Sequence, residues 1–218
     1  MAKVTSKEIQ RRLELMKSLD LAYPGTVQDL CALQFKAPFQ LLVATILSAQ
    51  CTDERVNATT PKLFENFATP EEMARATQEE LEKLIHSTGF YKNKARNILA
   101  LSRVLLSDFG GEVPDSMETL SALPGVGRKT ANVVLSVAFS KPGLPVDTHV
   151  LRLSKRLGLT PEKDPVKVER DLMLWVPPEE AGGLSLRLIL HGRKVCLARK
   201  PKCEICPLAD LCPSASGI

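Results

Sequence analysis

The stretch LSALPGVGRKTANVVLSVAF, residues 120–139, decides how this chain folds. A short helical pattern stops at the Pro-Gly-Val-Gly of residues 124–127, and a longer one starts at Arg128. Gly125 and Gly127 admit backbone angles closed to other residues and place no side chain between the main chain and an approaching ligand. The second helix would point unpaired N–H groups and the positive end of its dipole into the same space. We therefore expect an anion to bind at this turn.

Two known phosphate-binding loops do not match this turn. A P-loop requires Gly-Lys followed by Ser or Thr, whereas Arg128 separates Gly127 from Lys129. The dinucleotide motif would need a glycine at Thr130 and a strand before the turn. The remaining pattern resembles the helix-hairpin-helix motif, which holds DNA by its phosphates and does not read its sequence. Taken alone, the four residues are better explained as a glycine turn between two packed helices.

Length and composition fit a soluble protein with a sizeable core. The 218 residues allow one or two domains, and 44% of them are hydrophobic. The net charge is only +4, but six basic and no acidic residues lie between Arg187 and Lys202, which suits a polyanion or a solvated face. No signal peptide or membrane span is apparent, so we expect a cytoplasmic protein without membrane contact. In that reducing compartment, the six cysteines are not expected to form three disulfides.

The pattern of apolar residues predicts an all-α fold, because no stretch shows sustained strand alternation. Ser6 is expected to cap a first helix that carries Ile9, Leu13 and Met16 on one face. The apolar segment from Pro38 to Leu47 is expected to form a buried helix, and Pro61 to divide residues 53–67 into two short helices. Further helices are expected to begin at caps: Thr69 with Glu72, Thr77 with Glu80, Ser116, Asp147 or Thr148, and Asp164.

Four cysteines near the C-terminus form a second motif. Cys196, Cys203, Cys206 and Cys212 are separated by six, two and five residues, which indicates a metal site. Structural zinc usually uses two Cys-x-x-Cys pairs, and only Cys203 and Cys206 form one. A cubane iron–sulfur cluster needs one thiolate at each iron and suits wider, unequal spacing. The spacing favours a cluster and leaves zinc open. We expect the remaining cysteines, Cys31 and Cys51, to be inert core thiols.

Several motifs together resemble the endonuclease III family of helix-hairpin-helix DNA glycosylases. They are LPGVGRKTANVV from Leu123, VDTHV from Val146, LSAQCTD from Leu47, LHGR from Leu190 and the cysteine loop, and they span nearly the whole chain. The resemblance implies a base-excision-repair enzyme that removes oxidised pyrimidines from duplex DNA and cleaves the strand at the abasic site by β-elimination. It also implies a [4Fe-4S] cluster, chiefly structural, on the four cysteines. The expected partner is double-stranded DNA with damaged pyrimidines or abasic sites, bound by a monomer.

The same resemblance implies two helical domains that flank a DNA-binding cleft. Residues 30–141 would form a six-helix domain with the helix-hairpin-helix at about 117–136. Residues 1–29 and 142–218 would form the second domain, with the cluster loop at 196–212. Lys129 and Asp147 are then expected on opposite sides of the cleft.

Lys129 and Asp147 are the expected catalytic residues. A glycosylase that also cleaves the strand needs an amine to attack C1′, because the imine lets the 2′ proton leave and the 3′ phosphate be eliminated. Lys129 lies beside Arg128 in a first helical turn, where positive charge and expected partial burial favour the neutral amine. Asp147 would stabilise the developing positive charge on the sugar or help to activate the amine. Without the resemblance, Lys129 would be read as a phosphate-binding lysine and Asp147 as a helix cap.

The remaining site residues are expected to contact DNA. A flipped base leaves a gap in the duplex, and Gln50 matches the family residue that enters it. Phe90 falls where several relatives carry a leucine wedge, a departure that leaves the opposite-base preference open. His149 matches a DNA-contacting histidine, and Lys200 is expected to meet a phosphate. The hairpin contacts are expected from Leu123, Gly125, Val126, Gly127 and Arg128.

Two other functions remain to be distinguished from this one. An adenine-mismatch glycosylase shares the cluster and the Asp, but that family usually lacks the nucleophilic Lys and carries a further C-terminal domain. A non-catalytic DNA-binding module would keep the Pro-Gly-Val-Gly turn and need neither Lys129 nor Asp147.

Overall fold

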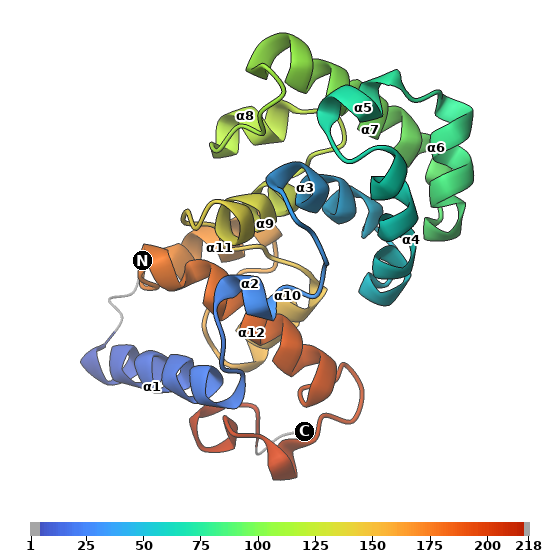
Figure 1. The fold of residues 1–218 in the computed structure, drawn as a ribbon. Coiled ribbons are helices and arrows are strands. Elements are labelled where there is room, and N and C mark those ends of the chain that lie inside the picture. The colour runs from blue at the N-terminus through green and yellow to red at the C-terminus, as the bar shows by residue number, and fades with distance from the viewer. Residues whose placement is uncertain (1–4, 216–218) are drawn as a thin grey trace. The chain divides into compact units, whose positions relative to one another are not determined.

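The computed structural model describes residues 5–215, and this part of the chain contains helices and no strand (Figure 1). The predicted all-α fold is confirmed. Internal contacts divide the chain into two units, one formed by Cys31–Ser140 and the other by the residues up to Leu30 and from Lys141 onward. Within residues 5–215, no helix combines the length and the apolar character needed to cross a membrane.

The unit Cys31–Ser140 contains seven α-helices, where the family resemblance led us to expect six. Its centre is α3, in which every residue from Phe39 to Leu47 is buried, as predicted. Helices α4, α7 and α9 pack against α3. The bounds are α3 Pro38–Leu47, α4 Asp53–Asn66, α5 Pro70–Arg75, α6 Gln78–Ile85, a 3-10 turn η1 His86–Thr88, α7 Tyr91–Phe109, α8 Met117–Ala122 and α9 Arg128–Ala138.

The expected break at Pro61 is wrong, because α4 runs uninterrupted from Asp53 to Asn66 with Pro61 inside it. A proline in a helix interior removes one backbone hydrogen bond and costs about 3 kcal/mol. Burial of Val56, Thr60 and Leu63 on one face of α4 offsets that cost. The tertiary contacts of the whole helix therefore decide its length.

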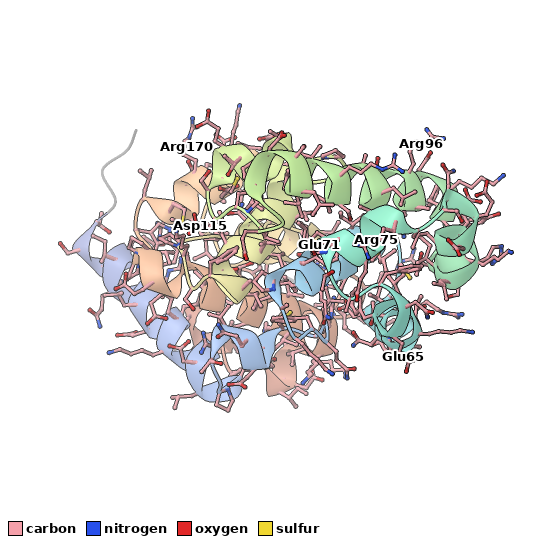
Figure 2. The ribbon with its side chains drawn as sticks, turned by 45° about the horizontal axis from the view of Figure 1, so that its top comes forward. Glu65, Glu71, Arg75, Arg96, Asp115 and Arg170 are labelled. Atoms are coloured by element: carbon pink, nitrogen blue, oxygen red, sulfur yellow. The ribbon has the colours of Figure 1, made fainter. Side chains whose placement is uncertain are left out.

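The predicted caps are confirmed where the signal is local. Both capping boxes form: Thr69 with Glu72 at α5 and Thr77 with Glu80 at α6. Ser116 caps α8 by accepting a hydrogen bond from the N–H of Thr119. Exposed charged side chains such as Glu65 on α4 and Arg96 on α7 point away from the ribbon (Figure 2).

The second unit is built around α12, against which α1, α2 and α10 pack. Asp147 caps α10 and Asp164 caps α11, as expected. The bounds are α1 Ser6–Ala22, α2 Val27–Leu30, α10 Thr148–Arg156, α11 Pro165–Met173, a 3-10 turn η2 Pro178–Glu180, α12 Ala181–Lys194, and two more 3-10 turns, η3 Cys203–Ile205 and η4 Ala209–Leu211.

Helix α1 differs from expectation at its cap and in its buried face. Thr5, and not Ser6, is the N-cap and accepts from the N–H of Glu8. The residues that α1 buries are Leu15, Met16 and Leu19, whereas Ile9 is 46% and Leu13 is 39% exposed. The expected face came from periodicity within α1 alone, and the packing of α1 on α12 and η4 selects a neighbouring face.

Candidate functional site

The turn between α8 and α9 is anchored from inside the protein. Leu123 and Val126 are buried, and the N–H of Val126 donates to the carbonyl of Leu123 over 3.1 Å. Gly125 has a φ of +76°, and a Cβ built on it would lie 2.8 Å from Cβ of Asn97 on α7. Gly125 is therefore required by both the backbone angle and the close approach of α7. Any DNA contact from Leu123 or Val126 has to come from the main chain.

Gly127 differs from Gly125, and one part of our expectation for it is wrong. Its φ is −89° and its ψ is 172°, which other residues also adopt, so the backbone angle does not require glycine. A Cβ on Gly127 would meet no atom within 4 Å. The open space lies at the N-terminus of α9, where Gly127 is the N-cap and makes no side-chain cap hydrogen bond. The turn thus leaves its main chain accessible to a ligand from outside, as the sequence predicted.

Lys129 lies in the first turn of α9, two residues after this open space. The first main-chain bond of the helix joins the N–H of Ala131 to the carbonyl of Gly127 over 2.9 Å. Residues 128–130 therefore precede the regular ladder, and their N–H groups point out of the helix N-terminus. The expected partial burial of Lys129 is wrong, because its side chain and that of Arg128 are exposed. Nothing in this unit covers the amine.

Asp147 is held firmly by the start of α10. Its Oδ1 accepts hydrogen bonds from the N–H of His149 over 2.8 Å and from the N–H of Val150 over 2.9 Å. Both bonds use Oδ1. Within residues 5–215, Oδ2 makes no hydrogen bond. The half-buried carboxylate is thus the expected cap of α10, and the two cap bonds fix the direction of its second oxygen. His149 is half-buried, and its Nδ1 lies 3.1 Å from Nη2 of Arg152.

The other expected DNA contacts share an unusual backbone conformation. Gln50, Phe90 and Lys200 have φ values of 54°, 48° and 50°, and all three side chains are exposed. Left-handed residues other than glycine are uncommon, and such strained positions gather at functional sites. Phe90, with 64% of its surface exposed, is the most unusual of these. A large aromatic side chain held outward in this way fits contact with a partner.

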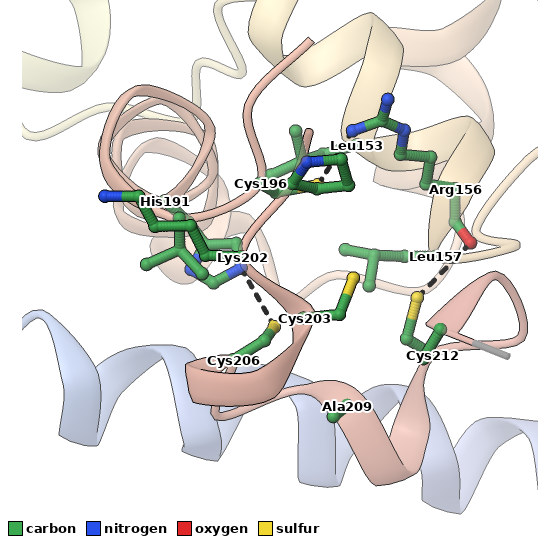
Figure 3. A pocket seen from close by; sticks show the side chains of 13 residues that line it. Leu153, Arg156, Leu157, His191, Cys196, Lys202, Cys203, Cys206, Ala209 and Cys212 are labelled. Atoms are coloured by element: carbon green, nitrogen blue, oxygen red, sulfur yellow. Dashed lines mark hydrogen bonds between the residues drawn. The ribbon is translucent and has the colours of Figure 1, made fainter. Parts of the chain in front are cut away.

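The four C-terminal cysteines line one pocket, as the spacing predicted (Figure 3). All six cysteines lie in the described part of the chain, and none forms a disulfide. Two nitrogen atoms approach the sulfurs: Nη1 of Arg156 donates to Sγ of Cys196 over 3.3 Å, and Nε2 of His191 lies 3.4 Å from Sγ of Cys206. Among residues 5–215, no three His, Cys, Asp or Glu side chains are grouped as a single metal ion would need.

The chemistry of this pocket fits an iron–sulfur cluster. Burial raises the pKa of the Cys206 thiol, and the neighbouring cysteines act in the same direction. Four thiolates in this position would repel one another unless iron neutralised them. The hydrogen bond that Arg156 donates to Sγ of Cys196 stabilises the thiolate form of that residue.

Several residues of the site were not found from the sequence. Asn97, Arg156 and His191 act through contacts distant in the chain, and only the long basic side chain of Arg156 near a helix C-terminus offered a signal. Burial lowers the pKa of His191 to about 4, and its Nδ1 meets the hydroxyl of Tyr23 over 2.9 Å.

Two further expectations are corrected in part. Arg187, at the start of the basic run, pairs with Asp20 over 3.0 Å and donates to the carbonyl of Tyr23, so it stabilises the fold. Within that run, Arg199, Lys200 and Lys202 are exposed. Cys31 and Cys51 are half-buried and do not belong to the core.

Comparison with known proteins agrees with this arrangement. Residues 43–178 match the family model of the HhH-GPD superfamily base excision DNA repair protein, and residues 196–212 match the iron-sulfur binding domain of endonuclease III. Endonuclease III of Synechocystis sp. is 53% identical, over 99% of this chain and 97% of its own.

Two solved structures are similar over nearly the full chain. A non-covalent endonuclease III–DNA complex has a TM-score of 0.88 and 44% identity, and covers 95% of this chain and 96% of that one. A trapped endonuclease III–DNA covalent intermediate has the same score and identity, and covers 95% and 97%. The chain therefore belongs to the endonuclease III family of base-excision DNA repair proteins, and its cysteine loop is the family's [4Fe-4S] cluster site.

Proposed function

We propose that this protein removes oxidised pyrimidines from double-stranded DNA and cleaves the strand at the resulting abasic site, with Lys129 as the nucleophile. The observation that carries the proposal is the position of Lys129. Its exposed amine lies in the first turn of α9, two residues after the uncovered main chain of Gly127. A strand held there by a phosphate would place a sugar next to the amine.

The proposed reaction proceeds through a covalent imine. Nζ of Lys129 bonds to C1′ as the base departs with the electron pair of the glycosidic bond, and the base takes up a proton. The nitrogen then gives up one proton, and the C1′–O4′ bond breaks as O4′ takes up a proton, which leaves a protonated imine on the opened sugar. The imine acidifies the 2′ position, and loss of that proton expels the 3′ phosphate by β-elimination. Water hydrolyses the remaining imine and regenerates Lys129.

Asp147 supports this reaction electrostatically. Positive charge develops on the sugar as the base leaves, and a carboxylate of fixed direction stabilises it. Its Oδ1 is occupied by the N–H groups of His149 and Val150, which leaves Oδ2 for the substrate. Because the cap already orients this carboxylate, little reorganisation is needed during the reaction.

The remaining site residues are proposed to hold the DNA. Gln50 and Phe90 would occupy the gap left by the flipped nucleotide, and His149 and Lys200 would contact the strand. When bound, the cluster cross-links the loop of Cys196, Cys203, Cys206 and Cys212 and so keeps Lys200 in place. We also propose that the protein acts as a monomer in the cytoplasm; sedimentation in the presence of the cluster tests the oligomeric state.

Borohydride trapping tests the proposed function. Reduction of the imine should give a covalent adduct between the protein and an oligonucleotide duplex that carries an abasic site or thymine glycol. Lys129→Ala should abolish the adduct, whereas Lys83→Ala, which removes an exposed lysine on α6, should leave it unchanged. Base release without any adduct would indicate a monofunctional glycosylase instead. Binding without base release would indicate a non-catalytic DNA-binding protein.

A further inference from the structure

Lys94 is a buried cation that none of the chemistry above uses. It lies in the first turn of α7, and only 5% of its surface is exposed. Its Nζ donates to the carbonyl oxygen of Leu47 over 2.8 Å and to that of Thr88 over 2.8 Å. Burial lowers the pKa of Lys94. Burying an ammonium group costs free energy unless it is well hydrogen-bonded, and these two hydrogen bonds offset that cost.

The two carbonyls mark the bases of two short turns. Leu47 is the last residue of α3, and Gln50 follows three residues later. Thr88 is the last residue of η1, and Phe90 follows two residues later. The two carbonyl oxygens therefore bind the same nitrogen atom, although they are 41 residues apart in sequence. Lys94 joins the start of the Gln50 turn to the start of the Phe90 turn.

A contribution to helix stability alone does not explain this arrangement. Lys94 lies near the N-terminus of α7, where the helix dipole disfavours a positive charge. The carbonyl of Leu47, in contrast, belongs to the negative C-terminal end of α3, where a cation is favourable. The favourable interactions of Lys94 are thus with the two turns that follow α3 and η1, and not with its own helix.

Both turns also carry backbone strain. Gln50 has a φ of 54° and Phe90 a φ of 48°, and both side chains are exposed. Strained residues of this kind persist only where the surrounding structure determines their conformation. A buried ammonium that binds the carbonyls before each turn provides such a constraint.

We propose that Lys94 is a positioning residue that fixes the Gln50 turn and the Phe90 turn relative to each other, so that the two side chains meet the DNA duplex as a pair. The proposal rests on the proposed function, because it takes Gln50 and Phe90 as DNA contacts. Lys94 itself touches neither the DNA nor the reacting atoms. It acts through the geometry of the two turns.

A double-mutant cycle tests this role. The probe is a duplex with one tetrahydrofuran abasic analogue, and its dissociation constant is measured for Gln50→Ala, Phe90→Ala and the double variant. If the two side chains bind as a pair, their effects are non-additive in the native background. In the Lys94→Met background, which keeps the length of the side chain and removes its donors, the same effects should become additive. Binding by Lys94→Met alone should weaken about tenfold, because both turns must then be ordered on binding.

A matched core variant separates positioning from simple loss of stability. Leu105→Ala removes a fully buried side chain from the same helix, about three turns beyond Lys94. We expect it to lower Tm and to leave the coupling between Gln50 and Phe90 intact. Lys94→Gln removes the charge but keeps an NH2 group with two N–H donors, and it serves as a second variant if Lys94→Met does not fold.

Three results would overturn the proposal. The first is the same coupling with and without the Lys94 ammonium. The second is loss of coupling in Leu105→Ala as well, which would make the effect one of stability. The third is full affinity in both Gln50→Ala and Phe90→Ala, which would leave no contacts to position. Borohydride trapping by the otherwise native protein is run in parallel, because a trapped adduct shows that the Lys129 chemistry holds even where the Lys94 proposal fails.

Discussion

The contrast between the two glycines of the hairpin gives a sharp test of where DNA is held. Gly127→Ala introduces a methyl group into space that no protein atom occupies within 4 Å, at a φ of −89° that alanine tolerates. Gly125→Ala introduces the same methyl group at a φ of +76° and 2.8 Å from Cβ of Asn97. We therefore expect Gly127→Ala to affect ligand binding and Gly125→Ala to affect the stability of the fold.

The expected effects on stability follow from this geometry. Alanine is a poorer N-cap than glycine by up to about 1 kcal/mol, and it gains about 0.4–1 kcal/mol by restricting the unfolded chain. These terms nearly cancel for Gly127→Ala, so its Tm should stay within about 3 °C of the native value. For Gly125→Ala, the left-handed conformation costs about 1–2 kcal/mol and the contact with Asn97 about 1–3 kcal/mol more. Its Tm should fall by roughly 10 °C.

The expected effects on binding are the reverse. A phosphate held by the N–H groups at the start of α9 makes charge-assisted hydrogen bonds worth about 1.5–3 kcal/mol, so Gly127→Ala should weaken binding about 10- to 100-fold. The factor should be the same for undamaged duplex and for duplex with a tetrahydrofuran site, because a phosphate contact carries no base information. Fluorescence anisotropy at fixed salt and calorimetric unfolding measure the two quantities. Native affinity in Gly127→Ala would refute the placement of a phosphate at this turn.

Three further predictions follow from the site and its surroundings. Asp147→Asn keeps an oxygen that caps α10 and loses the charge, so single-turnover base release should fall at least about 100-fold while Tm changes by less than about 3 °C; a small loss of rate would argue against the electrostatic role. Arg11 and Arg12 hold the pKa of Glu8 at about 2, below its ordinary 4.5, so Glu8 stabilises the fold above pH 4.5 and this contribution is lost as the pH falls to about 2. Glu8→Gln should therefore lower stability at pH 7 by no more than about 1 kcal/mol in urea unfolding, and the difference should disappear near pH 2. Cys206→Ala should reduce the iron and sulfide content of anaerobically purified protein and weaken DNA binding, and native iron content in this variant would argue against Cys206 as a ligand.

The sequence predicted those features that depend on neighbours a few residues apart. The capping boxes at Thr69 and Thr77, and the caps at Asp147 and Asp164, form because each side chain reaches an N–H group two or three residues ahead. The turn at residues 124–127 is local in the same sense. The spacing of the four cysteines indicated a metal site, and the family motifs then led to Lys129 and Asp147, because such motifs combine local geometry with a known chemistry.

The features that were missed depend on contacts between distant segments. Pro61 remains inside α4 because burial of one face of that helix outweighs the lost hydrogen bond, which composition alone does not reveal. The buried face of α1 is chosen by α12 and η4. Asn97 lies 28 positions before Gly125, and their spacing in the sequence does not predict that the two residues pack together.

The left-handed residues show why these long-range contacts matter for function. Gln50, Phe90 and Lys200 each carry a strain of about 1–3 kcal/mol, and side chains project outward from these positions only while the strain is supported. Lys94 supplies hydrogen bonds at the base of two of these turns, and the cysteine loop encloses the third between Cys196 and Cys203. Weakening either support would remove its hydrogen bonds or cross-links, but it would also release the backbone strain, so the net loss of folding free energy would be small. The exposed side chains, in contrast, would no longer be held in one conformation. Damage to these supports should therefore appear in DNA binding before it appears in unfolding.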